Sequence, residues 1–181
     1  RIFEGTNEIN RLLLVDSVLK KGAKGVLPVF ELAEEAFQEL KDLNGAPVPA
    51  TGYFEEKDQY IANFKKVVLM LLKSASDTFQ RKLSQEQEVL SNISDCIIQT
   101  YAAESVVLRL KKMESMKSEA ETALYRDMAD VFVYDTATRI RKFASDSANS
   151  YAEGEVAAQL EKGISYFTTV AGVNVKEARR R

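Results

Sequence analysis

The sequence predicts an all-α protein, an up-and-down helical bundle with three long helices plus shorter flanking helices. Apolar residues recur at spacings of three and four along most of the 181 residues, which is the period of a helix with one buried face. Runs that alternate apolar and polar residues, as half-buried strands do, are missing. The 3 Pro and 8 Gly residues fall mostly between the periodic segments, so little interrupts the helices.

The first two expected helices are short. One covers about residues 7–21, with Thr6 or Asn7 as its N-terminal cap and two glycines after its last turn. Pro28 suits the first turn of the second helix, which reaches about residue 40. These two helices carry one apolar face each and need a larger neighbour to cover it.

A loop that contains two of the three prolines separates these helices from the rest of the chain. Prolines and glycines in such density mark a break between elements. We therefore divide the chain into residues 1–43, a linker loop at residues 44–53, and a helical bundle over residues 54–181.

The first long helix is expected over about residues 54–82. Its apolar stripe is wide enough to pack against more than one neighbour. The stripe is either the core of the bundle or a docking face for another domain, and we favour the core. It consists of two adjacent seams: Tyr60, Phe64, Val67 and Leu71 in one, and Ile61, Val68, Leu72, Ala75 and Phe79 in the other.

Capping boxes are expected to open the second and third long helices, Ser84 with Gln87 and Ser118 with Glu121. The second helix alternates steps of four and three, as helices that cross at a shallow angle do. Its inward residues are Val89, Ile93, Cys96, Thr100, Ala103, Val107 and Leu110. For the third helix we expect Leu124, Met128, Val131, Phe132, Ile140 and Phe143 to face inward.

A last helix is expected over about residues 153–171, and Asn174 with Glu177 caps a short basic end. The three arginines at 179–181 have two interpretations, a solvated and frayed terminus or a contact for anionic lipid headgroups or CoA phosphates. We favour the first. Cys96 lies on a buried seam and is expected to be a packing residue rather than a reactive thiol.

Composition excludes several classes of function. The chain has no His and one Cys, which removes Ser-His-Asp and Cys-His catalysis and an internal disulfide, and we predict no metal site. A net charge of −2 gives no general attraction for nucleic acid, and we expect none as a partner. The longest apolar run, residues 67–72, is too short to cross a bilayer. Any acid–base chemistry therefore falls to Asp, Glu, Lys, Tyr or the single Cys.

The most informative segment is RIFEGTNEINR at residues 1–11. Glu4 precedes a glycine and a hydroxyl residue directly before an apolar helix. Taken alone, such a glutamate is an N-terminal charge that the helix dipole favours, with Gly5 as a joint and Thr6 as a cap. Because the chain starts with Arg rather than Met, we expect it to be the C-terminal part of a longer protein.

This segment resembles a motif of the acyl-CoA dehydrogenase family, in which an aromatic residue, Glu-Gly-Thr, a polar residue, an acidic or polar residue and Ile precede a late helix of the flavin-binding unit. Residues 3–9 match position by position, and several unlike side chains at fixed spacing make the match specific. The close resemblance covers about the first two dozen residues. The long extension resembles the very-long-chain type, which appends a C-terminal helical domain. Residues 1–43 would then be the tail end of the family's C-terminal helical unit, and residues 54–181 the appended domain.

The resemblance implies roles for individual residues. Glu4 matches the catalytic base that removes the α-proton of a fatty acyl-CoA, while the β-hydrogen leaves as hydride to FAD and a trans-2-enoyl-CoA forms. Gly5 matches a substrate-binding position, where the missing Cβ lets the acyl chain come close. Thr6, Asn7 and Glu8 match positions that contact FAD. Because nearly all of the family's site lies outside this chain, we expect the fragment alone to be inactive and not to bind FAD.

The same resemblance implies partners and location. It implies fatty acyl-CoA as substrate, an electron-transfer flavoprotein as electron acceptor and a homodimer. We expect a cytoplasmic bacterial protein, with the mitochondrial matrix as the other possibility. The alternative function is a non-catalytic helical module for dimerisation, docking or peripheral membrane contact, which the long apolar seams also favour.

Overall fold

The computed structural model describes residues 5–43 and 45–181, and over these residues the chain is helical and holds no strand. This confirms the predicted all-α class. The elements are α1 (Asn7–Ala23), α2 (Val29–Asp42), α3 (Tyr53–Phe79), the 3₁₀ helix η1 (Gln80–Gln85), α4 (Gln87–Glu114), α5 (Glu119–Asn149), α6 (Gly154–Phe167) and α7 (Val175–Ala178).

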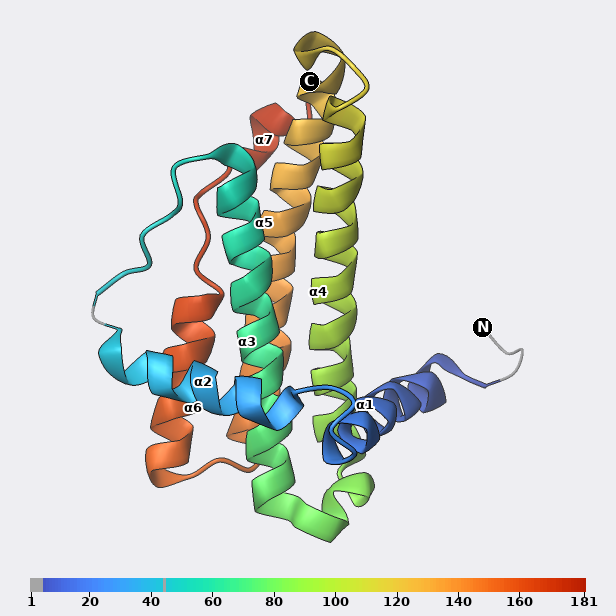
Figure 1. Ribbon diagram of the computed structural model, residues 1–181, viewed down its shortest axis with the longest axis vertical. Helices are drawn as coiled ribbons and strands as arrows, with labels where there is room; N and C mark the ends of the chain where they lie inside the picture. Colours follow the sequence, from blue (N-terminus) through green and yellow to red (C-terminus); the bar gives the residue numbers. More distant parts are fainter. Residues whose placement is uncertain (1–4, 44) are drawn as a thin grey trace.

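The three long helices α3, α4 and α5 stand side by side and alternate in direction, as Figure 1 shows. Helix α6 packs beside α3 and α5, and α2 crosses the bundle against α3 and α6. Helix α1 packs against the N-terminal part of α4, which Arg11 reaches through Asp95, and its first residues lead away from the bundle (Figure 1). The predicted up-down-up bundle with shorter flanking helices is thus present.

Helix α3 forms the centre of the core. All residues of its two predicted seams are buried except Phe79, which is partly buried. Phe64 and Leu71 are completely inaccessible to solvent. Both seams are covered because α3 packs against α2, α4, α5 and α6. The apolar stripe of α3 is therefore the core of the bundle, as favoured from the sequence.

Helix α4 buries every residue of its predicted seam, but its expected capping box is wrong. Ser84 lies inside η1, and α4 begins at Gln87 after Glu86, which makes no side-chain cap. The cause is Gln80, whose φ of 49° ends α3 and turns the chain into the 3₁₀ segment. Ser84 therefore belongs to the 3₁₀ segment and does not cap the start of α4.

The capping box of α5 is confirmed, since the Glu121 carboxylate accepts a hydrogen bond of 3.0 Å from the Ser118 backbone N–H. The predicted inward face is wrong at Leu124 and Met128, which are 48% and 59% exposed. Ile140 is buried, and the other three predicted residues are partly buried. Small side chains line much of the buried face instead, because α4 and α5 lie close together along most of their length. They are Thr122, Ala129, Thr136, Ala137, Ala144, Ser147 and Ala148.

The C-terminal region differs from the expected frayed end. Helix α6 stops at Phe167 rather than near residue 171, and the chain then runs to α7, where Asn174 Oδ1 accepts the predicted hydrogen bond from the Glu177 N–H at 3.2 Å. Arg179 and Arg181 form ion pairs with Asp135 and Asp127 of α5 at 3.2 and 3.0 Å. These arginine side chains stay largely exposed, but acidic partners on α5 direct them back to the bundle.

Candidate functional site at the start of helix α1

The start of α1 is shaped by Gly5 and Thr6. The Thr6 Oγ1 accepts a hydrogen bond of 3.3 Å from the Ile9 N–H, which confirms Thr6 as the N-terminal cap. Gly5 has a φ of +119°, a conformation that L side chains rarely adopt, and a Cβ there would lie 3.3 Å from Asn10 Oδ1. A glycine is therefore required where the chain turns into the helix. Glu4, the predicted base, lies outside the described residues.

The structure brings the other four predicted site residues together on one exposed turn. Gly5, Thr6, Asn7 and Glu8 are all exposed, and Glu8 lies in the first turn of α1. The first N–H groups of a helix have no partner within it and carry a partial positive charge. This turn can therefore contribute N–H donors and polar side chains to one edge of a site for an anionic group.

Arg11 fixes the position of this turn. Its Nε donates a hydrogen bond of 2.7 Å to Asp95 Oδ1 of α4, and its Nη1 donates to the Asn7 carbonyl oxygen at 3.4 Å. The Arg11 and Asp95 side chains are only 31% and 20% exposed, so solvent screens the pair less than a surface pair. Sequence reasoning found no role for Arg11 beyond the motif, because its partner is 84 residues away.

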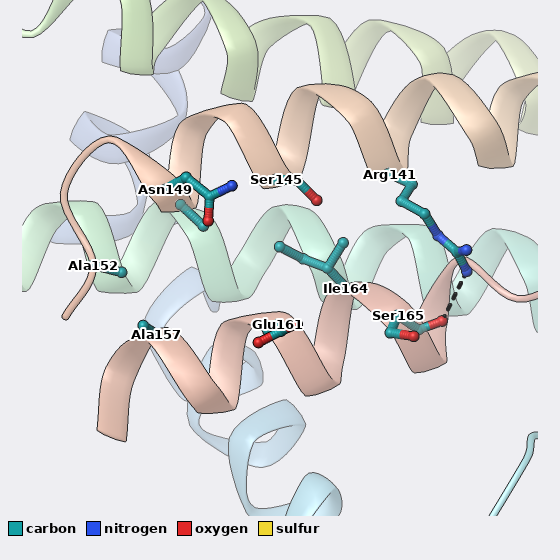
Figure 2. A pocket seen from close by; sticks show the side chains of 9 residues that line it. Arg141, Ser145, Asn149, Ala152, Ala157, Glu161, Ile164 and Ser165 are labelled. Carbon is teal, nitrogen blue, oxygen red and sulfur yellow. Dashed lines mark hydrogen bonds between the residues drawn. The ribbon is translucent and has the colours of Figure 1, made fainter. Parts of the chain in front are cut away.

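A polar cleft of about 260 Å³ lies between α5 and α6 and was not predicted (Figure 2). Its one cationic side chain, Arg141, donates hydrogen bonds to Thr168 Oγ1 at 2.8 Å and to the Ser165 carbonyl oxygen at 3.1 Å. Arg141 thereby satisfies the C-terminal end of α6, where a cation is favourable. The remaining lining side chains are small, apart from Asn149, Glu161 and Ile164. The cleft is explained by helix capping and packing of small residues.

A second unpredicted feature is the buried ammonium of Lys57, which pairs with Glu56 at 2.8 Å and with Asp130 at 2.9 Å. Asp130 also accepts a hydrogen bond from the Tyr53 hydroxyl at 3.0 Å. Burial alone lowers the pKa of Lys57, but the hydrogen bonds to Glu56 and Asp130 outweigh it and raise the pKa. Lys57 is thus held protonated and joins α3 to α5 rather than serving as a base.

Across the part of the chain that the structure describes, we also examined the reactivity of the cysteine, possible metal-binding clusters and possible membrane-spanning helices. Burial raises the pKa of the Cys96 thiol, and its Sγ lies 3.8 Å from the Ile140 carbonyl oxygen, which confirms Cys96 as a packing residue. No group of three or more His, Cys, Asp or Glu side chains among residues 5–43 and 45–181 is arranged to hold a metal ion. Within the same residues, none of the helices has both the length and the apolar character that a membrane span needs.

Known proteins resemble this chain over nearly its whole length. It is 33% identical to a probable acyl-CoA dehydrogenase of Bacillus subtilis (strain 168) over 183 aligned residues, which cover 99% of this chain and 30% of the relative. It matches the crystal structure of an acyl-CoA dehydrogenase complexed with FAD from Bacillus anthracis with a TM-score of 0.88 and 29% identity, over 99% of this chain and 30% of that one. The chain therefore spans about 30% of the length of these relatives.

A family model agrees with these similarities. Residues 63–161 match the model described as acyl-CoA dehydrogenase, C-terminal domain. The matched segment starts within α3, covers α4 and α5, and ends within α6, so it contains most of the core described above. The chain belongs to the family of acyl-CoA dehydrogenase C-terminal domains.

Proposed function

We propose that the chain is the C-terminal part of an FAD-dependent acyl-CoA dehydrogenase that converts a fatty acyl-CoA to a trans-2-enoyl-CoA. The observation that carries this proposal is the similarity over 99% of the chain to a probable acyl-CoA dehydrogenase and to one complexed with FAD. The exposed turn at Gly5 and Thr6, directly after Glu4, supports it, because this turn carries the residues that resemble the family's catalytic motif.

In this proposal Glu4 accepts the α-proton of the acyl thioester. An α C–H is a weak acid, so the carboxylate must lose water on substrate binding, which raises its basicity. FAD, when bound, accepts the β-hydrogen as hydride. Gly5 leaves room beside Glu4 for the acyl chain, and Thr6, Asn7 and Glu8 present polar groups and helix N–H donors to the cofactor.

The bundle acts as the support of this turn. Arg11 and Asp95 join α1 to α4, and α4 is held in turn by α3 and α5. Because the chain covers only 30% of the length of its relatives, we propose that it neither binds FAD nor dehydrogenates an acyl-CoA by itself.

The test uses the full-length parent enzyme and the substitution Glu4→Gln. The variant is expected to keep its flavin absorbance and its affinity for acyl-CoA, while flavin reduction by substrate falls by about 10³-fold or more because the general base is lost. Glu31→Gln on the exposed face of α2 is the control and keeps normal turnover. Normal flavin reduction in Glu4→Gln would place the base elsewhere, and a parent that purifies without flavin would overturn the proposal.

Partners and location belong to the same proposal. An electron-transfer flavoprotein would reoxidise the flavin, two copies would form a dimer, and the enzyme would work in a bacterial cytoplasm. The C-terminal arginines argue little for a peripheral membrane contact. Arg179 and Arg181 already pair with aspartates of α5, which offset their positive charges. Reoxidation by purified electron-transfer flavoprotein and light scattering of the parent test the first two points.

A further inference from the structure

A pocket of about 210 Å³ lies over the N-terminal half of α3, between the loop that leads into this helix and the segment that follows α6. The loop lies on the side of the bundle away from the start of α1 (Figure 1), so the pocket is separate from the candidate functional site. We call it the Asn63 pocket. Its lining includes Pro47 and Pro49 of the loop, Tyr60 and Asn63 of α3, and Val170 and Ala171 after α6.

Hydrogen bonds to α3 fix both walls of the Asn63 pocket. The Gln59 Nε2 donates to the Val48 carbonyl oxygen at 3.1 Å, and the Gln59 Oε1 accepts from the Ala50 N–H at 2.9 Å. On the other wall, the Tyr60 hydroxyl oxygen accepts a hydrogen bond of 2.9 Å from the Ala171 N–H. The pocket is therefore formed before a ligand arrives, which lowers the cost of binding.

Asn63 is the polar group in this pocket that lacks a partner. The residue is 7% exposed, and its amide makes no hydrogen bond to residues 5–43 and 45–181. Gln59, one turn earlier on α3, uses both of its amide atoms to hold the loop. The Thr169 hydroxyl, which also lines the pocket, donates to the Ser165 carbonyl oxygen at 2.8 Å. A buried amide without a partner is costly, so Asn63 presents a donor and an acceptor that a ligand can satisfy.

The rest of the lining suits an uncharged ligand with a short apolar body. Among the described residues, no charged side chain lines the pocket. Apolar surface comes from the side chains of Pro47, Pro49, Tyr60 and Val170. The volume is about seven times the roughly 30 Å³ that a water molecule occupies in the liquid, and it is below the roughly 300–1,000 Å³ of sites for drug-sized ligands. A molecule of a few carbon atoms therefore fits.

We propose that the Asn63 pocket binds a small uncharged molecule that carries a primary amide on a short apolar body. A primary amide places an acceptor oxygen and N–H donors on one planar head, which matches the amide of Asn63. The ligand oxygen accepts from Asn63 Nδ2, a ligand N–H donates to Asn63 Oδ1, and the apolar body lies against the proline loop and Val170. Water also satisfies the Asn63 amide, but an apolar body that displaces water from these walls gains affinity.

The experiment measures binding of isobutyramide to the full-length parent by saturation-transfer NMR, with isobutyrate as a charged probe of the same shape. We expect saturable binding of isobutyramide with a dissociation constant on the order of millimolar, as a fragment of this size gives. Isobutyrate should bind at least about tenfold more weakly, because burying a carboxylate without a cation is unfavourable. Asn63→Leu removes the amide at similar size and should weaken binding of isobutyramide at least about tenfold. Asn149→Leu, at the exposed end of α5, is the control and keeps the affinity.

The outcomes separate this pocket from other sites of the parent. A tenfold loss in Asn63→Leu with unchanged binding in Asn149→Leu supports the proposal. If thermal unfolding shows that Asn63→Leu does not fold, Val170→Phe replaces it, since a larger ring fills the pocket while Asn63 stays. A smaller loss, an equal loss in Asn149→Leu, or no saturable binding by the wild type overturns the proposal. Isobutyrate that binds as tightly as isobutyramide also overturns it. A parent without dehydrogenase activity would leave this test unaffected, because the pocket lies apart from α1.

Discussion

The Arg11 guanidinium lies 2.7 Å from the Asp95 carboxylate and forms a charged link between α1 and the bundle. Arg11→Ala is expected to lower the free energy of unfolding by about 1 kcal/mol, because both side chains are mostly shielded from solvent. Hydrogen exchange of the α1 amides should accelerate in the variant. Asp16→Asn, which removes only an exposed pair with Lys20, is the control, and equal effects of the two substitutions would refute a special role for Arg11.

Asp130 is the partner of the buried Lys57 that lies on α5. Asp130→Asn removes the negative charge beside a side chain that is 8% exposed, and it also disturbs the Tyr53 hydrogen bond. Because Glu56 still pairs with Lys57, the cost is that of one hydrogen bond to a charged group, about 1.5–3 kcal/mol, which urea unfolding measures directly. The matched control is Asp58→Asn, because Asp58 is 55% exposed and pairs with Lys111 at the surface; it should cost less than about 1 kcal/mol.

Acid should weaken the contact between Glu114 and Arg126. Hydrogen bonding by the Arg126 guanidinium lowers the pKa of Glu114 below its ordinary value of 4.5. The folded state therefore gains stability from ionised Glu114 at pH values above 4.5 and loses it as the pH falls through the lowered pKa. The difference in unfolding free energy between the wild type and Glu114→Gln should be present at neutral pH and shrink in acid. In an Arg126→Gln background that pH-dependent difference should be absent.

The tight contact between α4 and α5 predicts an unusual response to side-chain size. Ala144 is completely buried, and Ala144→Leu should destabilise the bundle by about 1–3 kcal/mol through overpacking. Leu124→Ala on the same helix should change stability by about 0.5 kcal/mol or less, because Leu124 is 48% exposed. Thermal unfolding of both variants checks this. A larger loss of stability for Leu124→Ala than for Ala144→Leu would indicate that Leu124 faces the core, as the sequence predicted.

The sequence allowed the bundle and two of its three long helices to be predicted well, because α3 and α4 bury large apolar residues at helical spacing. Helix α5 was harder to interpret, since its buried face is largely Ala, Thr and Ser, which carry a weak hydrophobic signal. The burial of these small residues depends on how closely α4 approaches, and that distance is a property of the packed bundle. The turn at Gln80 was missed for a similar reason, because nothing local requires a positive φ there.

The candidate site could be predicted only in part. The Thr6 cap and the exposed first turn of α1 follow from local sequence, and the family assignment follows the same motif. The Arg11–Asp95 pair and the Arg141 cap on α6 each join residues far apart in the chain. Such contacts depend on tertiary packing, so a single sequence gives no signal for them.

The burial of Cys96 has a consequence for oxidative damage. Oxidants attack the thiolate, and this sulfur is both shielded from solvent and held as a neutral thiol. Peroxide should therefore leave the folded bundle unmodified at sulfur 96 and convert it to sulfenic and higher acids only in molecules that have opened. The fraction of the Cys96 peptide that mass spectrometry finds oxidised would therefore report how often the bundle unfolds inside a cell.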